Sequence, residues 1–335
     1  MPRVAPALHH WSQMRAFRSL STVIGLAILA VLVMLVGKDE ALAATARALG
    51  WQSLLVCLPF VAIMAVDTLG WRYAFAYDRV PFLRLVAARV AGEAVNVMTA
   101  VVPVGGDAIK VWFLRPHVPY RESVASVIIA KTTITLSQAL FLLLGVAVAL
   151  ALSVDARLVT AMLWLLLVEL VGAGGFLLVQ VTGLLGRGAR RLARFGKLKA
   201  IVSAENLDQT LQSFYRRQWR RFSLSMGFHL LGWLMGVLET WLFLKVLHVP
   251  ASLATAVVIE TLGSAVRFAT FFMPGSLGAL EGANAAAFAA LGFGAQAGLA
   301  FSLLRRLRQV VWIGLGVLVL LVARGRAPLA PETPA

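Results

Sequence analysis

The sequence predicts an all-α membrane protein that crosses the bilayer several times, and three observations support this prediction. Hydrophobic residues make up 60% of the 335 residues and charged residues only 14%, whereas soluble domains average roughly 45–50% and about 25%. The apolar residues gather in uncharged runs long enough to span a bilayer, which takes roughly 20 residues in a helix. The excess of basic residues lies mainly between those runs, where such residues set the orientation of membrane proteins.

The same composition excludes other classes of protein. A net charge of +16 is typical of nucleic-acid binders, but a soluble protein of that class could not keep this much apolar surface out of water. We therefore expect no nucleic-acid partner. Cys57 is the only cysteine, so a disulfide framework or a cysteine-based metal site is excluded. No other pattern predicts a cofactor or a metal.

Six apolar runs predict helices that cross the bilayer completely. They lie near residues 20–37, 50–71, 123–152, 157–182, 222–247 and 297–322. A cleavable signal peptide is the alternative for the first run, since Ala41-Leu42-Ala43 resembles a cleavage site. The run is long for a signal peptide, however, and Lys38-Asp39-Glu40 separates it from that site. These features favour a retained helix.

Two further hydrophobic stretches, 82–117 and 253–292, are broken by Gly, Pro and charged residues. If each stretch enters and leaves the membrane on one side, every strongly basic loop falls on the same side of the bilayer. That arrangement satisfies the rule that cytoplasmic loops are positively charged. It predicts cytoplasmic termini at 1–19 and 324–335 around a membrane domain at 20–323, and it makes both stretches re-entrant helical hairpins.

The segment 187–221 carries ten basic residues against two acidic ones. Within it, Leu207, Leu211 and Phe214 are spaced as on one face of a helix that lies flat at the membrane interface. Basic side chains on the other face would attract anionic lipids, at about 1 kcal/mol each. A solvated basic linker is the alternative interpretation, and the sequence favours neither.

An internal repeat relates the two broken stretches. Gly92–Pro103 aligns with Gly263–Pro274, and five of the twelve aligned positions are identical. Three complete crossings separate the copies, and because this number is odd the repeats, at 50–152 and 222–322, should be inverted. Inverted repeats with interrupted helices are typical of transporters, whose binding site lies where the repeats meet. Two chance loops rich in Gly and Pro are the alternative.

Charged residues and glycines around the two breaks form the predicted binding site. An ionised group near the bilayer centre costs at least about 2.5–3.5 kcal/mol, so such groups normally face a cavity and pair with one another. The free N–H groups where a half-helix begins also suit an anion. The predicted set is Glu93, Asn96, Gly105, Gly106, Asp107, Lys110, Lys131, Arg267, Gly275, Gly278, Glu281 and Arg305.

Within this set we expect the ion pairs Asp107–Lys131 and Glu281–Arg305, with Lys110 and Arg267 contacting a phosphate. Purely structural ion pairs, or side chains that reach the interface, are the alternative. We assign Asp67, Glu169 and Glu239 to holding helices together.

No catalytic motif accompanies these residues. The HExxH, CxxC, GxSxG and P-loop patterns are absent, so the sequence gives no support for a known enzyme class. His229 lies in an apolar run, where a single histidine is typically a packing residue.

At these motifs the sequence resembles the flippase-like membrane domain of lysylphosphatidylglycerol synthases and its stand-alone relatives. The resemblance covers roughly residues 20–323. It rests on Gly92-Glu93-Ala94-Val95-Asn96, Pro103-Val104-Gly105-Gly106-Asp107-Ala108-Ile109-Lys110, Lys131, Pro274-Gly275-Ser276-Leu277-Gly278-Ala279-Leu280-Glu281 and Arg305. It implies a multi-pass protein of the bacterial inner membrane, with two re-entrant hairpins, that moves lipids between leaflets.

The resemblance also bears on activity and cargo. In the synthases a soluble aminoacyl-transferase domain follows the membrane domain, whereas this chain ends soon after Arg324, so we expect no aminoacylation from tRNA. The run Ala91-Gly92-Glu93-Ala94-Val95-Asn96, with Ala130-Lys131-Thr132-Thr133 and Ser137-Gln138, is similar to the hopanoid-associated branch. That similarity implies a hopanoid-type cargo.

The sequence thus predicts a transporter or flippase for an amphipathic lipid, with a polar cavity between two inverted hairpins. Lys110, Arg267 and Arg305 would hold an anionic headgroup. Asp107, Glu281 and Glu93 would neutralise these bases in the empty site or carry a proton. One alternative is an intramembrane lipid-modifying enzyme that acts through the carboxylates. Another is a scaffold for lipid-biosynthesis enzymes, including those of hopanoids, that uses the segment 187–221.

Overall fold

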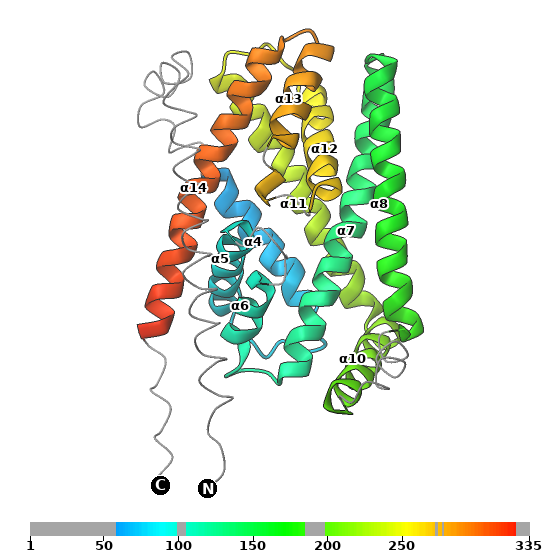
Figure 1. Cartoon of the computed structure of the whole chain (residues 1–335), viewed down its shortest axis with the longest axis vertical. Helices are drawn as coiled ribbons and strands as arrows, with labels where there is room; N and C mark the ends of the chain where they lie inside the picture. Colours follow the sequence, from blue (N-terminus) through cyan, green and yellow to red (C-terminus); the bar gives the residue numbers. More distant parts are fainter. Residues whose placement is uncertain (1–57, 99–104, 185–197, 272–273, 277, 326–335) are drawn as a thin grey trace, which may run out of the picture.

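The computed structural model describes residues 58–98, 105–184, 198–271, 274–276 and 278–325, and every regular element in these ranges is a helix (Figure 1). The predicted first span (20–37), the N-terminal segment 1–19 and most of the tail 324–335 lie outside the described residues. The remaining predicted elements are described wholly or in part.

Four described helices are long and apolar enough to cross a membrane, and they match four of the predicted spans. They are α7 (Tyr120–Ala151), α8 (Ala156–Thr182), α11 (Trp219–Val246) and α14 (Ala295–Gly325). Local chemistry sets the ends of α8. The Asp155 carboxylate accepts a hydrogen bond from the Arg157 amide at 2.8 Å, and Gly183 ends the helix with a left-handed φ of 69°, as is usual at helix ends.

Helix α4 (Leu58–Tyr73) is the described part of the predicted span 50–71, and it packs along α11. The two helices approach closely at Gly70, where a Cβ atom would lie 2.6 Å from the His229 imidazole. The Ser225 hydroxyl also donates a hydrogen bond to the Gly70 carbonyl at 2.8 Å. This close crossing brings Asp67, about one helical turn before Gly70, beside His229.

The first broken stretch forms two helices, α5 (Phe82–Met98) and α6 (Gly105–Leu114), which pack tightly on each other. Glycines make this possible, because a Cβ atom at Gly106 would collide with the Gly92 carbonyl oxygen and with Asn96. The Asn96 side-chain oxygen instead accepts a hydrogen bond from the Gly106 amide at 3.0 Å. One of the free N–H groups at the start of α6 is thereby satisfied.

The second broken stretch forms α12 (Leu253–Ala269), the short 3₁₀ helix η2 (Pro274–Ser276) and α13 (Ala279–Ala290). Left-handed φ angles at Gly275 (53°) and Gly278 (79°) turn the chain between α12 and α13, a conformation that glycine adopts without a steric cost. In Figure 1, α12 and α13 lie in the upper part of the molecule, and α5 and α6 lie in the lower part. The long helices α7, α8 and α14 run past both.

The basic segment includes helix α10 (Leu198–Arg217), at the lower end of the molecule (Figure 1). Its apolar residues Leu211 and Phe214 are buried against the rest of the protein. The Tyr215 hydroxyl donates a hydrogen bond to the Gln180 side chain on α8 at 2.6 Å. This part of the segment is therefore a helix docked on the membrane helices.

Candidate functional site

A cavity of about 480 Å³ lies among the two broken stretches and the helices α4, α7, α11 and α14. Its wall contains nine charged side chains, which is unusual for the interior of an apolar helical protein. They are Asp67, Arg89, Glu93, Glu239, Glu260, Arg267, Arg305, Arg306 and Arg308. Aromatic side chains, among them Phe60, Trp233 and Trp312, line the space between them.

One side of the cavity is built around the carboxylate of Glu260 on α12, which is 3% exposed. It forms ion pairs with Arg267, at 3.2 Å, and with Arg305. The Thr240 hydroxyl of α11 donates a hydrogen bond to the same carboxylate at 2.6 Å. Two guanidinium groups therefore share one carboxylate, and the local positive charge exceeds the negative charge.

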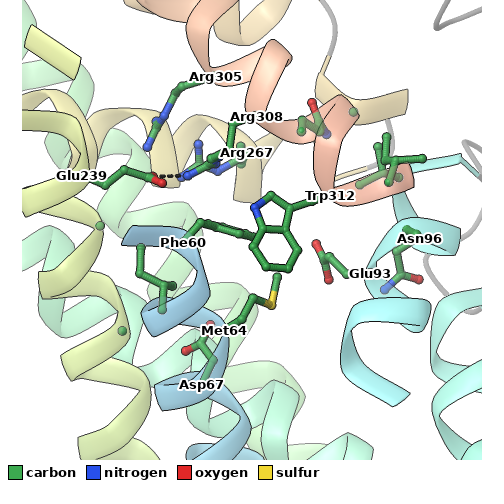
Figure 2. A pocket seen from close by; sticks show the side chains of 18 of the residues that line it. Phe60, Met64, Asp67, Glu93, Asn96, Glu239, Arg267, Arg305, Arg308 and Trp312 are labelled. Carbon is green, nitrogen blue, oxygen red and sulfur yellow. Dashed lines mark hydrogen bonds and ion pairs between the residues drawn. The ribbon is translucent and has the colours of Figure 1, made fainter. Parts of the chain in front are cut away.

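A second ion pair on this side joins Glu239 of α11 to Arg308 of α14. The Arg308 guanidinium lies 4.2 Å from the centroid of the Phe60 ring, which in turn contacts Trp312 at 5.0 Å between ring centroids. Figure 2 shows Arg267, Arg305 and Arg308 close to Glu239 on one side of the Trp312 indole. Arg308, Phe60 and Trp312 thus contact one another in sequence along this side of the cavity.

The opposite side of the cavity comes from α4 and α5. Asp67 forms an ion pair with Arg89 at 2.9 Å and contacts the Nδ1 atom of His229 at 3.3 Å. Glu93 and Asn96 lie on the other side of the Trp312 indole from the arginines (Figure 2). The cavity therefore has a strongly basic side and a side where acidic and amide groups are accessible.

The structure brings together some of the predicted site residues and separates others. Five of them line the cavity: Glu93, Asn96, Arg267, Gly275 and Arg305. The predicted pair Asp107–Lys131 is present, and Lys110 joins it at 3.2 Å from Asp107. This lysine cluster, defined by those three residues, does not line the cavity. The other predicted residues outside the lining are Gly105, Gly106, Gly278 and Glu281.

The predicted pair Glu281–Arg305 is wrong. Glu281 pairs with Arg306 at 2.7 Å, and Arg305 pairs with Glu260. Consecutive residues of an α-helix point about 100° apart, so Arg306 faces η2 and α13 while Arg305 faces α12. Arg306 also donates a hydrogen bond to the Gly275 carbonyl at 2.8 Å, and Glu281 accepts one from the Gly278 amide at 2.7 Å. Arg306 therefore connects α14 to the turn before α13.

Sequence reasoning missed several cavity residues. Asp67 and Glu239 do join helices, as expected, but both also line the cavity, and Arg89, Arg308 and Trp312 were not predicted at all. A signal for two of them was present, because Arg305, Arg308 and Trp312 are spaced three and four residues apart, which places them on one face of a helix. Arg89 carried no such signal, since its pairing depends on how α5 packs on α4.

Metal binding has no support in the described part of the chain. No three His, Cys, Asp or Glu side chains there are placed to hold a metal ion. The polar side chains of the cavity are mainly guanidinium groups paired with single carboxylates, an arrangement that suits an organic anion better than a cation.

A comparison with known protein families identifies the chain. The model of the transmembrane region of lysylphosphatidylglycerol synthase matches residues 22–317. The chain belongs to this family. It is a multi-pass membrane protein whose family is named for the synthesis of a membrane lipid. No curated protein and no solved structure matched the chain.

Family membership confirms the resemblance seen in the sequence, and the match covers nearly the same residues. It places the charged cavity inside a lysylphosphatidylglycerol synthase transmembrane region. Interaction with membrane lipids follows from that family.

Proposed function

We propose that the protein moves an amphipathic lipid between the two leaflets of the bilayer. The observation that carries this proposal is the cavity, which combines five arginines with acidic and aromatic side chains inside a membrane protein of a lipid-handling family. Buried charges in membrane proteins are expensive, and they typically mark the path of a polar substrate. A lipid headgroup is the polar substrate that such a family would meet.

In the mechanism that we propose, the helix pairs α5–α6 and α12–α13 act as re-entrant hairpins that enter the membrane from opposite sides. The cavity draws its wall from α5 in the first pair and from α12, η2 and α13 in the second. Small movements of the two hairpins would open the cavity to each leaflet in turn, as in transporters built from inverted repeats. The headgroup would cross inside the cavity while the acyl chains stayed in the bilayer.

The proposed orientation follows the positive-inside rule. The bacterial inner membrane would hold the chain through six complete crossings, with both termini in the cytoplasm. Helix α10 and the α6–α7 connection lie at one end of the molecule, and the α7–α8 connection lies at the other (Figure 1). The end with α10 and the α6–α7 connection would be cytoplasmic. A cysteine-accessibility experiment at Arg115 and at Arg157 would test this orientation.

The proposed roles of the charged side chains follow from their pairing. Arg267 and Arg305 would exchange part of their contact with Glu260 for a phosphate group when the headgroup enters. Glu260 would neutralise both arginines in the empty site. In the lysine cluster, Asp107 and Lys110 lie on α6 of the first hairpin and Lys131 lies on α7. The cluster would contact the headgroup on its way into or out of the cavity.

A translocation assay in liposomes tests the proposal. The purified full chain would be reconstituted with a lipid that carries a fluorescent group on one acyl chain, and the fraction reached by a membrane-impermeant quencher would be followed with time. We expect the quencher to reach the labelled lipid of the inner leaflet faster than in protein-free liposomes. The variant Arg305→Ala should abolish most of this gain. Arg79→Ala is the matched control, because Arg79 is half-exposed, forms an ion pair with Glu122 at 3.6 Å and is not among the cavity-lining residues.

Two outcomes would contradict the proposal. Equal rates with and without wild-type protein would remove lipid translocation as the function, and equal rates for wild type and Arg305→Ala would remove the cavity as its site. An intramembrane enzyme is the second candidate, because the family is named for synthases. Mass spectrometry of the same liposomes distinguishes the two, since an enzyme would change the mass of the lipid.

A further inference from the structure

Glu169 is a buried acid, outside the cavity, that the proposed translocation does not use. It lies in the middle of α8, thirteen residues from each end (156 to 169 and 169 to 182), which is about 20 Å along the helix. The residue is 0% exposed, and neither of its carboxylate oxygens has a hydrogen-bond partner among the described residues. Unlike Asp67 and Glu239, it therefore joins no helices through an ion pair in this part of the chain.

The surroundings of Glu169 are apolar. It belongs to a buried stripe of α8 in which Leu166 precedes it by three positions and Ala173 follows it by four. Leu166 shares one apolar cluster with Leu142 of α7 and Leu262 of α12. Residues three or four positions apart lie on one face of a helix, so Glu169 faces the seam where α7 and α12 cover α8.

Within the described ranges, no charged or titratable side chain faces Glu169 from the helices around it. On α8 itself the nearest is Arg157, twelve positions earlier (157 to 169). On α7 there is none between Lys131 and the end of the helix. On α12, Glu260 and Arg267 face the cavity. The others lie near the end of α8 that holds Gln180, eleven positions beyond Glu169: Arg121 and Glu122 on α7, and Asp208, Tyr215, Arg216 and Arg217 on α10.

A carboxyl group in these surroundings is protonated. In an apolar interior, a carboxylate without a counter-charge or a hydrogen-bond donor is far more costly than the neutral acid, so such a group takes up a proton instead. Asp67, Glu239 and Glu260 each pair with a guanidinium group. Glu169 therefore differs from the acids of the cavity, because it binds a proton where they bind arginine.

Helix α12 connects Glu169 to the cavity. Arg267 lines the cavity, whereas the next residue, Phe268, faces α8, where a Cβ atom at Gly172 would lie 3.1 Å from its ring. Gly172 is about one turn after Glu169 on α8. Because packed interiors transmit displacements, a movement of α12 that repositions Arg267 also moves the ring of Phe268 across the part of α8 that holds Glu169.

A polar contact between α7 and α12 lies close to both the cavity and this seam. Ile134 of α7 lines the cavity, and one turn later the buried Gln138 side chain donates a hydrogen bond to the Ser264 carbonyl of α12 at 2.8 Å. When α12 moves away from α7, both groups lose this partner, and water from the cavity can take its place. The same movement gives water access to the seam that covers Glu169.

From these observations we propose that Glu169 is a proton-binding site that couples lipid translocation to proton transfer. The coupling rests on the proposed translocation, whereas the proton site does not. The carboxyl binds one proton when α12 packs on α8 and gives that proton to water when the seam opens, so only its O–H bond forms and breaks. Because an ionised Glu169 cannot return to the apolar seam, the helices pack together again only after the next proton is bound.

Infrared spectroscopy of the purified full chain tests the proton site without any transport. A protonated carboxyl has a C=O stretching band that lies apart from the bands of carboxylates and amides. We expect this band in the wild type at pH 7, where exposed carboxyls are ionised. Glu169→Gln keeps the shape and the neutrality of the protonated side chain, and it should remove the band. The amide bands of the same spectra show that the variant is folded.

The control for this measurement is Glu122→Gln. The Glu122 carboxyl is partly exposed and pairs with Arg79, so its replacement should leave the band unchanged. A wild-type spectrum without the band at pH 7 would overturn the proton site. A band of the same strength in Glu169→Gln would overturn its assignment to Glu169.

Translocation under a pH gradient tests the coupling. The liposome assay would be run with and without a difference of about one pH unit across the membrane, which changes the proton activity about tenfold, and we expect the wild-type rate to change about three- to tenfold. Glu169→Gln cannot release a proton and should show one rate under both conditions. Glu122→Gln should respond as the wild type does. A wild-type rate that ignores the gradient, or a response that persists in Glu169→Gln, would overturn the coupling.

The outcomes separate this inference from the proposed function. If lipid crosses at the same rate with and without the gradient, the function stands and the coupling fails. If no lipid crosses, the function and the coupling fail together, and the infrared band alone then decides whether Glu169 binds a proton.

Discussion

The two broken stretches of the chain arrange the same kinds of charge in different ways. In the first, Asp107 pairs with Lys131, the base 24 positions later (107 to 131). In the second, Glu281 pairs with Arg306, the base 25 positions later (281 to 306). This shift of one residue rotates the pairing base by about 100° around its helix. It frees Arg305, the base expected from the repeat, to face Glu260 and the cavity.

The two clusters in which one carboxylate lies between two cations also differ in their exposure to solvent. Asp107 lies between Lys110 and Lys131, and Glu260 lies between Arg267 and Arg305, so each has one carboxylate for two cations. The Lys131 side chain is 39% exposed, whereas that of Arg305 is 5% exposed. Charge pairs near solvent contribute little to stability, while breaking a buried pair is strongly destabilising. The cluster of Glu260, Arg267 and Arg305 therefore depends on its pairing much more than the lysine cluster does.

Removing the shared carboxylate should therefore have the largest effect. Glu260→Gln would leave the guanidinium groups of Arg267 and Arg305 without a counter-charge, and should reduce the free energy of unfolding by about 3–5 kcal/mol. Asp107→Asn should cost clearly less. Chemical unfolding of both variants in detergent micelles measures the difference. Equal losses would contradict the contrast between the two clusters.

The next largest effect should come from the shifted base. Arg306→Ala would free the Glu281 carboxylate and the Gly275 carbonyl, and we expect a loss of about 2–3 kcal/mol and faster hydrogen exchange in residues 278–282. The matched change in the first half, Lys131→Ala, leaves Lys110 beside Asp107. Its effect on exchange near Gly106 should be smaller. Similar exchange in both variants would show that the shift has no structural consequence.

Glycines at the two breaks provide a third test, because they are needed for different reasons. Gly106→Ala would push a Cβ atom into the Gly92 carbonyl and Asn96, and should cost about 1–3 kcal/mol. Gly278→Ala meets open space but a left-handed φ of 79°, so it should cost about 1 kcal/mol. Thermal unfolding of both variants compares close packing with backbone strain. A larger loss at Gly278 would reverse this ranking.

The smallest effect concerns the loops that lead into the two stretches. Asp78, before α5, accepts a hydrogen bond from Arg221 at 2.6 Å, and chiefly this contact holds the pKa of its carboxyl below the ordinary 3.8. Because the pKa is lowered in the folded state, the contact stabilises the protein above pH 3.8 and loses its effect as pH falls through the folded-state pKa.

The loop before α12, residues 247–252, contains no acidic residue. Of these two loops, only the one before α5 should therefore lose a stabilising contact when the pH is lowered. Asp78→Asn should weaken the protein by less than about 1 kcal/mol at pH 7 and should have a smaller effect at pH 2.5, where the carboxyl is protonated to a greater extent. Unfolding curves at both pH values measure this. An equal effect of Asp78→Asn at the two pH values would contradict the role of the charged carboxyl.

Parts of the site could be predicted because the chemistry is local. Proline and glycine mark the breaks, and α6 and α13 begin next to them, at Gly105 and Ala279. The pair Asp107–Lys131 followed from charges that need partners in an apolar environment. That Glu281 pairs with Arg306 and not with Arg305 could not be predicted. The alignment of the repeats places a residue to within one position, but it does not give the direction of the side chain. Arg89 was missed because only the packing of α5 on α4 brings it to Asp67.

The amino-acid sequence by itself determined that this protein is helical, crosses a membrane repeatedly and belongs to a family that handles lipids. These properties follow from long apolar runs and from the glycine, proline and charged residues that interrupt them. Such patterns act locally, between residues that are close together in the sequence. Only the tertiary structure decided which arginines face the cavity and which carboxylates they share. Such pairings depend on distances of a few ångström between helices far apart in sequence, because the energy of a charge pair changes steeply over that range.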